Sequence, residues 1–298
     1  MEKEILEKYL KAGKIAAKVL EFGKTLVKPG VPVLEVVEKM EEKMLSLGGK
    51  PAFPINVSIN DMAAHWHPLI NDETTIKESD YVKLDVGVHV DGYIGDTAST
   101  VRVLGKDELI KCSEEMLKKA LEIVRPGITI GEIGETIENV AKEFGFNPIR
   151  NLTGHSLDRY DVHSGLIIPN VKNDSKYQLR EDEVIAIEPF CTSGNGFVKD
   201  SGSALIFRWI ADKPTRSFES RKILELAREK FEKLPFAKRW VQKILPPIKV
   251  ELGFKELLAV NALYSYKPLR EVSGKPVAQS EHTIIVKEKP IIITSLQS

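Results

Sequence analysis

The segment "LVKPGVPVLEVVEKMEEKMLSLGGKP" (residues 26–51) decides the fold, because "IVRPGITIGEIGETIENVAKEFGFNP" (residues 123–148) aligns with it without a gap. Each segment begins with a Pro-Gly turn, continues as an amphipathic helix and closes with a glycine and a proline. Self-similarity of this kind indicates a repeated unit. We therefore expect two halves packed about a pseudo-twofold axis, with a cleft between them that suits a ligand.

The correspondence continues beyond the helices. "SDYVKLDV" (79–86) matches "DEVIAIEP" (182–189), which places Asp85 opposite Glu188. The alternative is chance similarity between two ordinary helix–strand segments. The joint agreement of the Pro-Gly and acid positions favours duplication, with matched acids converging between the halves.

A hairpin carries two further acids. In residues 81–100 the Asp-Gly pair at 91–92 is a strong signal for a two-residue turn, and its register puts Asp85 and Asp96 on one face as diagonal neighbours. Gly87, opposite Asp96, is expected to leave that space empty. The pair is compatible with a solvated face. In a cavity, the two carboxylates would repel each other unless a cation neutralised them.

Four more side chains add to this pair. His155 and His163 lie among turn-prone residues, while Glu188 and Glu281 follow apolar, strand-like runs. Each alone is compatible with a structural histidine or a strand-end carboxylate in solvent. Mostly oxygen donors with one imidazole, and no cysteine, suit a pair of divalent ions such as Mn, Co, Fe or Zn. Hydrolysis is the chemistry that such a centre serves.

Composition excludes several classes of protein. The 298 residues carry 43 basic and 43 acidic side chains, so no global charge points to nucleic acid or an anionic membrane. Two cysteines make a disulfide framework unexpected and favour a reducing compartment. The N-terminus reads as a charged amphipathic helix, and no apolar run approaches a membrane span. A soluble, cytoplasmic protein is expected.

The chain divides into two parts in this interpretation. Residues 1–211 and 276–298 form an α/β catalytic domain, with its repeat at about 26–100 and 123–205. Residues 212–275 form a mostly helical insertion, including a helix over "GFKELLAVNALYSY" (253–266). Residues 212–243 hold ten Lys/Arg against five Asp/Glu. A solvated helix face explains this excess, and a docking surface for an acidic partner such as ribosomal RNA is the alternative.

Five motifs now identify a family. "GGKPAFPINVSINDMAAHW", "KLDVGVHVDGYIGDTA", "NLTGHSLDRYDVHSG", "IAIEPF" and "AQSEHTI" occur in one order over nearly the whole chain. This pattern resembles the type 2 methionine aminopeptidases of archaea and eukaryotes. The resemblance implies the pita-bread fold, a pseudo-symmetric α/β (α+β) arrangement around a two-metal cleft. Type 2 follows from the helical insertion between Glu188 and Glu281, which type 1 enzymes lack.

The resemblance also implies residue roles. Glu188 would shuttle the proton, while His65 and His163 would face the substrate and assist catalysis, and Phe53 would line the methionine pocket. Asp96 and Glu281 would bridge both metals. The full set of implied ligands for two divalent ions (Co, Mn, Fe or Zn) is Asp85, Asp96, His155, Glu188 and Glu281.

The implied reaction removes the N-terminal methionine of peptides and nascent chains with a small second residue, by attack of a metal-bridged hydroxide. A monomer, with ribosome association through the basic insertion, is expected. The alternatives are a proline-specific aminopeptidase or dipeptidase of the same fold, and a non-catalytic pita-bread binding protein. Ser280, Trp66 and His67 depart from the usual family pattern, and His67 is not expected to be a ligand. His89 is expected to be structural, and His282 to point away from Glu281.

Overall fold

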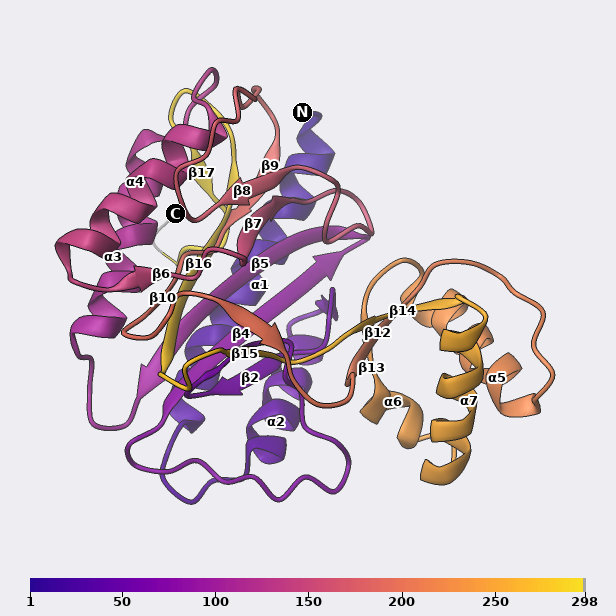
Figure 1. Ribbon diagram of the computed structural model, residues 1–298. Coiled ribbons are helices and arrows are strands. Elements are labelled where there is room, and N and C mark those ends of the chain that lie inside the picture. The colour runs from indigo at the N-terminus through magenta and orange to yellow at the C-terminus, as the bar shows by residue number, and fades with distance from the viewer. Residues whose placement is uncertain (297–298) are drawn as a thin grey trace.

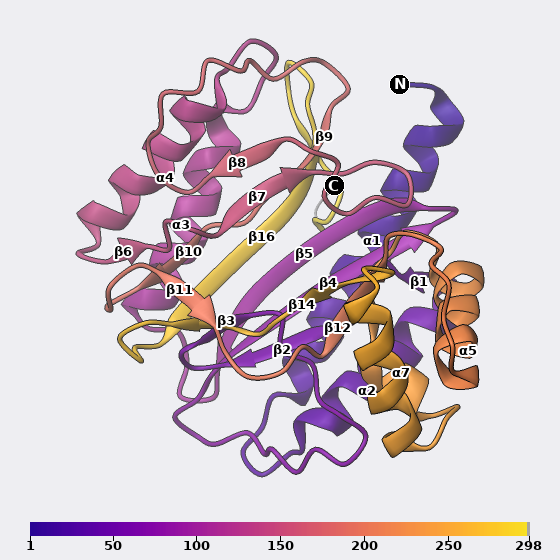
Figure 2. The same cartoon turned by 45° about the vertical axis from the view of Figure 1, so that its right-hand side comes forward.

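A computed structural model describes residues 1–296 as a large α/β body with a smaller lobe beside it (Figure 1). The order of the main path of the central sheet is β1-β4-β5-β16-β9-β7-β8. Figure 2 shows β16 running along the middle of this sheet, beside β5. The last long strand thus joins the two halves of the body.

The two halves repeat the same series of elements. The first half comprises α1 (Lys3–Leu26), α2 (Val33–Ser46), β1 (Lys50–Pro51), β2 (Asn56–Ile59), β3 (Met62–Ala64), β4 (Tyr81–Val90) and β5 (Tyr93–Arg102). The second half comprises α3 (Glu108–Ile123), α4 (Ile130–Glu143), β6 (Asn147–Pro148), β7 (Thr153–Ser156), β8 (Ile167–Pro169), β9 (Val184–Ile187) and β10 (Phe190–Thr192). Helices α2 and α4 occupy equivalent positions of the two aligned segments, as the sequence repeat predicts.

Local chemistry sets the ends of these helices. Thr129 caps α4 in a capping box, because its side chain accepts from the Glu132 N–H and the Glu132 carboxylate accepts from the Thr129 N–H. Gly48 and Gly145 follow α2 and α4 with φ of 79° and 76°, a left-handed conformation that favours glycine. The repeated glycines therefore end both helices in the same way.

The β4–β5 hairpin has the predicted register. Asp85 pairs with Ala98 and Gly87 with Asp96, and the turn residues Asp91 and Gly92 both have positive φ, as a type I′ turn requires. The alternate apolar side chains of β4 pack in a buried cluster with α1 and α2; they are Val82, Leu84, Val86 and Val88. Because side chains alternate along a strand, the two aspartates face the opposite side of the sheet.

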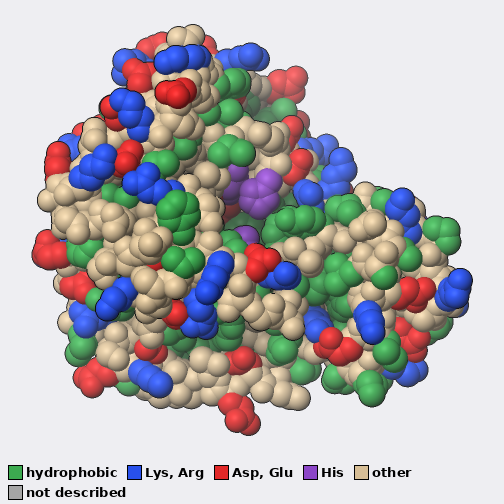
Figure 3. Space-filling model, viewed as in Figure 1, with side chains coloured by type: hydrophobic (Ala, Val, Ile, Leu, Met, Phe, Trp, Pro, Cys, Tyr) green, Lys and Arg blue, Asp and Glu red, His purple; other side chains and the backbone are tan. Residues whose placement is uncertain are grey.

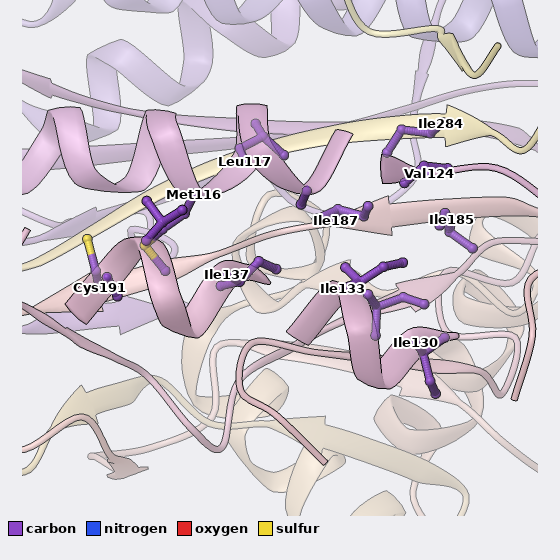
Figure 4. Close-up of a cluster of buried hydrophobic side chains, with 14 of the residues drawn as sticks. Met116, Leu117, Val124, Ile130, Ile133, Ile137, Ile185, Ile187, Cys191 and Ile284 are labelled. Carbon is purple, nitrogen blue, oxygen red and sulfur yellow. The ribbon is translucent and has the colours of Figure 1, made fainter. Parts of the chain in front are cut away.

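The second half has a matching core. Apolar side chains of α3 and α4, among them Met116 and Ile133, pack against Ile185 and Ile187 of β9 and Ile284 of β16 (Figure 4). Cys112 and Cys191 are both buried here and form no disulfide, as expected. Helices therefore cover one face of each half, and the other face is left for the site.

The lobe lies to one side of the body and is entered by β12 and left by β14 (Figure 1). This helical lobe, residues 206–266, comprises β12 (Ile206–Trp209), α5 (Phe218–Leu226), η1 (Ala227–Phe231), β13 (Phe236–Ala237), α6 (Lys238–Gln242), α7 (Pro247–Ala259) and β14 (Leu263–Tyr266). Three short strands pair in the order β13-β12-β14 and carry the helices. The remaining elements of the chain are β11 (Val198–Asp200), β15 (Leu269–Glu271), β16 (Val277–Ile285) and β17 (Ile291–Ile292).

One predicted helix is wrong. The helix expected over 253–266 ends at Ala259, because Asn261 adopts a φ of 54°, and residues 263–266 form β14 instead. Pairing with β12 overrides the helical pattern there. The division into 1–211 with 276–298 and an inserted 212–275 remains a proposal, since β15, inside that range, pairs with β3 and β11. Among residues 1–296, no helix is both long and apolar enough to cross a membrane.

Candidate metal centre

A cavity of about 480 Å³ opens on the side of the sheet that the helices leave uncovered. Figure 3 shows histidine side chains in the hollow between the body and the helical lobe. The cavity brings together every side chain that the sequence singled out for a site: Phe53, His65, Asp85, Asp96, His155, His163, Glu188 and Glu281. Its volume lies in the range of small-molecule sites.

The inner wall of the cavity holds a compact cluster. Asp96 on β5, His155 on β7 and Glu281 on β16 are buried, and each offers a ligand atom within 4.8 Å of the other two. The His155 Nε2 lies 3.8 Å from an Asp96 carboxylate oxygen and 3.5 Å from a Glu188 oxygen. Strands from both halves of the repeat thus converge on this point.

Burial leaves these acids poorly solvated. It raises the pKa of Asp85 to about 6. Burial, followed by repulsion from Asp85, raises the pKa of Asp96 well above its usual value, and the same two causes act on Glu188. Burial and the neighbouring carboxylates also raise the pKa of Glu281. Such shifts arise when like charges share a site without a cation.

The imidazole in this cluster is neutral. Burial lowers the pKa of His155 well below its usual value, and the nearby His163 lowers it further. A neutral imidazole nitrogen is the form that coordinates metals. His155 is therefore in the state a ligand requires.

The cluster fits divalent cations. The Asp85 Oδ1 and Asp96 Oδ1 are buried and have no hydrogen-bond partner within residues 1–296. A buried carboxylate oxygen without a partner is costly, and a cation would satisfy it. Four carboxylates and one imidazole are a donor set suited to divalent first-row metals.

Neighbouring residues orient the acids. Asn56 pairs with Asp85 across β2 and β4, and its side-chain N–H donates to Asp85 at 3.4 Å. The Asp96 N–H donates to the Thr283 hydroxyl at 2.8 Å, and the Thr97 hydroxyl donates to the Glu281 carbonyl at 2.8 Å. These bonds hold β5 against β16 and so keep Asp96 beside Glu281. Outer groups of this kind fix the geometry of metal ligands.

The space beside Gly87 is not empty, contrary to expectation. A Cβ at position 87 would lie 2.1 Å from the Phe53 ring. The glycine is needed because this buried ring occupies the site of its missing side chain. Phe53 is thereby held against the sheet at the wall of the cavity.

The outer part of the cavity is aromatic. His65 has a φ of 60°, a left-handed conformation that is rare for a non-glycine residue. Its ring meets Tyr266 edge-on at 5.5 Å, and the His163 ring lies 6.2 Å from Tyr266 and 4.5 Å from His155. Tyr266 comes from the helical lobe and was missed by sequence reasoning. Residues 263–266 continue a helical pattern in the sequence, so no local signal marked the strand that carries it.

The remaining histidines lie outside the cluster. The His89 ring accepts a hydrogen bond from the Gly92 N–H within the hairpin turn. His282 is hydrogen-bonded to Thr294, on the side of β16 away from the acids, as predicted. His67 lies within hydrogen-bond distance of Arg239 and the Ile55 carbonyl rather than of the cluster.

Comparison with known proteins identifies the family of this chain. Residues 7–288 match the model of metallopeptidase family M24. The chain is 46% identical to a methionine aminopeptidase of Thermococcus onnurineus over 97% of this chain and 99% of that protein. A methionine aminopeptidase structure from Thermotoga maritima matches with a TM-score of 0.73 and 26% identity, covering 99% of this chain and 98% of that one.

A structure of a thermophilic Arx1 matches with a TM-score of 0.84 at 20% identity, covering 98% of this chain and 91% of that one, and bears on the fold alone. The architecture is accordingly the pita-bread fold of this family. A metallopeptidase of this family uses a divalent metal, which agrees with the buried donor set. The chain belongs to metallopeptidase family M24 and, within it, to the methionine aminopeptidases of archaeal type.

Proposed function

We propose that this methionine aminopeptidase acts on peptides and nascent chains with two divalent ions, Co, Mn, Fe or Zn, in the cavity. The observation that carries the proposal is a set of carboxylates around a neutral imidazole, for which residues 1–296 provide no Lys or Arg partner. When bound, the ions supply a nucleophile at neutral pH and polarise the scissile carbonyl. The proposed ligands are Asp85, Asp96, His155, Glu188 and Glu281.

Glu188 is the proposed proton carrier. Its side chain is 15% exposed, so it is reachable from the cavity, and its carboxylate lies 3.5 Å from the His155 Nε2 at the centre of the cluster. It takes the proton released by the nucleophile and passes it to the nitrogen of the leaving peptide.

Two histidines would hold the reacting peptide bond. His163 is exposed at the cavity mouth, next to the His155 ring, where its N–H donates to the oxygen that gains charge. His65 lies close to the amide being cut, with its ring held against Tyr266. Neither needs to carry a positive charge, since a neutral imidazole still donates one hydrogen bond.

The methionine side chain would pack on Phe53. This ring is held over Gly87 beside the acids, and a thioether makes favourable contacts with an aromatic edge. The side chain of the second residue would point toward the narrow aromatic mouth at Tyr266. A small second residue is therefore preferred, because a large one would be crowded there.

A peptide assay tests the proposal. Metal-stripped protein receives Co, Mn, Fe or Zn and is offered Met-Ala-Ser, Met-Leu-Ser and an X-Pro peptide. We expect metal-dependent release of methionine from Met-Ala-Ser and little from Met-Leu-Ser. Cleavage of the X-Pro peptide alone would favour a proline-specific enzyme, and the absence of cleavage with any metal would favour a binding protein. His163→Ala is the control, since it should slow the reaction with metal content unchanged.

We also propose that the protein is a monomer that docks on ribosomes through the helical lobe. The basic surface is smaller than its sequence indicates, because Lys238 and Arg239 are buried. Lys213, Lys230 and Lys233 are exposed and remain candidates. Their reversal to glutamate should reduce co-sedimentation with ribosomes, with light scattering to check the mass. Unchanged co-sedimentation would remove the idea of docking.

A further inference from the structure

Arg239 is the buried charge at the contact between the helical lobe and the body, where Trp240 and Lys243 also bond to α2. Arg239 on α6 is fully buried, and its guanidinium cannot lose its charge in a protein. Its Nη1 donates to Glu38 at 3.0 Å and its Nη2 to Glu41 at 2.5 Å, both on α2. These carboxylates offset the cost of burying the cation. The Nε–H is left to donate elsewhere.

The Arg239 Nε–H donates to the chain segment that carries the cavity residue His65. The Arg239 Nε donates to the His67 Nε2 at 3.1 Å. Because this nitrogen accepts, the proton lies on Nδ1, which donates to the Ile55 carbonyl at 2.8 Å. His67 is itself 1% exposed. Its ring is therefore fixed in one tautomer and one orientation by bonds at both nitrogens.

His67 follows His65 by two residues, and the backbone at His65 is strained, with a φ of 60°. A positive φ at a non-glycine residue persists only where the surroundings impose it. On one side of His65, Ala64 pairs with Leu269 of β15. On the other side, the Val57 N–H donates to the Trp66 carbonyl at 3.1 Å, and His67 is tied down as described. The direction of the His65 ring thus depends on anchors at both ends.

We propose that Arg239, a residue of the helical lobe, is a positioning residue that acts through His67 to hold His65 in the cavity. The inference rests on the proposed function, in which His65 faces the substrate. As a consequence, the orientation of His65 depends on the packing of the helical lobe against α2. A purely structural role, in which Arg239 only fastens the lobe to α2, is the competing interpretation.

Two substitutions of His67 separate these interpretations, because one removes both of its hydrogen bonds and the other keeps them. His67→Phe keeps a ring but loses both hydrogen bonds, whereas His67→Gln offers an oxygen to Arg239 and an N–H to the Ile55 carbonyl. We expect His67→Phe to lower kcat on Met-Ala-Ser about 10- to 100-fold, as small misplacements of a reacting group do, with a smaller change in KM and unchanged metal content. His67→Gln should recover most of kcat.

The His65 ring itself is observed by NMR of labelled histidine, which needs no turnover. Its ring resonances should shift in His67→Phe and return toward the wild-type positions in His67→Gln. Unshifted His65 resonances, or a wild-type kcat in His67→Phe, would overturn the proposal even if the melting temperature fell. If the wild type does not cleave Met-Ala-Ser, the proposed function fails while the NMR comparison still decides the positioning role.

Discussion

Two buried charge clusters in this molecule differ in how they are neutralised. In the cavity, Asp96 and Glu188 lie 3.8 Å and 3.5 Å from the His155 Nε2, and this imidazole is neutral, so it supplies no positive charge. At the junction with the helical lobe, Glu38 and Glu41 face the guanidinium of Arg239. One cluster lacks a cation of its own, and the other contains one.

The pKa shifts follow the same division. The Lys243 ammonium, together with Arg239, lowers the pKa of Glu38 at the junction. In the cavity, burial and mutual repulsion raise the pKa of Asp96 and Glu281. The chain supplies its own cation at the junction, where the charges join the helical lobe to α2. Where the chain supplies acids without such a cation, an external metal is expected, and that cluster is the one suited to chemistry.

The largest expected effect is on turnover. Glu188→Gln removes the proton carrier but keeps the shape of the side chain, so activity on Met-Ala-Ser should fall about 10³-fold, within the range for general acid–base groups. The melting temperature should stay within a few degrees of the wild type. Glu41→Gln at the junction is the matched control and should retain turnover. Normal activity in Glu188→Gln would refute its assigned role.

A change at the junction should lower stability, in addition to the loss of turnover expected when the bond between Arg239 and His67 is broken. Arg239→Met removes the buried cation from Glu38 and Glu41, whose side chains are 40% and 16% exposed, and Glu38 keeps Lys243 as a partner. The loss of unfolding free energy should therefore stay below the roughly 3–5 kcal/mol of a fully buried pair. Urea unfolding measures this loss. Adding Glu38→Gln and Glu41→Gln to the same chain should restore part of the free energy of unfolding. If Arg239→Met unfolds at the same urea concentration as the wild type, the junction is not a neutralised buried cluster.

The smallest expected effect is a change with pH in how much bound metal raises the melting temperature. Asp85 has a folded-state pKa of about 6, above the unfolded value, so the folded metal-free protein binds extra protons between about pH 4 and 6. Its contribution to stability therefore falls as pH rises through that window. A metal competes with those protons. For each proton that it displaces, its affinity falls about tenfold per pH unit below 6.

Melting curves with and without metal check this sign. The gain in melting temperature on adding metal should be larger at pH 7.5 than at pH 5. Comparing the two curves at each pH cancels the contribution of the junction, which binds no metal. A gain that is equal at both pH values would mean that metal does not compete with protons for these carboxylates.

The features that could be predicted from the sequence are those that depend on short-range patterns. The repeat located α2 and α4, and the Asp-Gly turn set the register that puts Asp85 and Asp96 on one face. These features follow from helix periodicity, glycine conformation and turn geometry. The family motifs then extended the candidate site to both halves of the fold.

Contacts made across long distances in the chain were not predictable. Phe53 fills the space at Gly87. From the helical lobe, Tyr266 contacts the His65 ring and Arg239 donates a hydrogen bond to His67. No local pattern records which ring will meet which glycine. For the same reason, the pairing of β14 with β12 replaced a helix that the residues around 263–266 would otherwise favour.

Metal titration of the stripped protein tests the central claim most directly. Bound metal and melting temperature are measured together at pH 7.5 for the wild type, Asp96→Asn and Arg239→Met. We predict that the wild type binds two ions per chain and melts at a higher temperature, that Asp96→Asn loses this response, and that Arg239→Met keeps it. A wild type that binds no divalent ion, or an Asp96→Asn protein with the full response, would contradict the account.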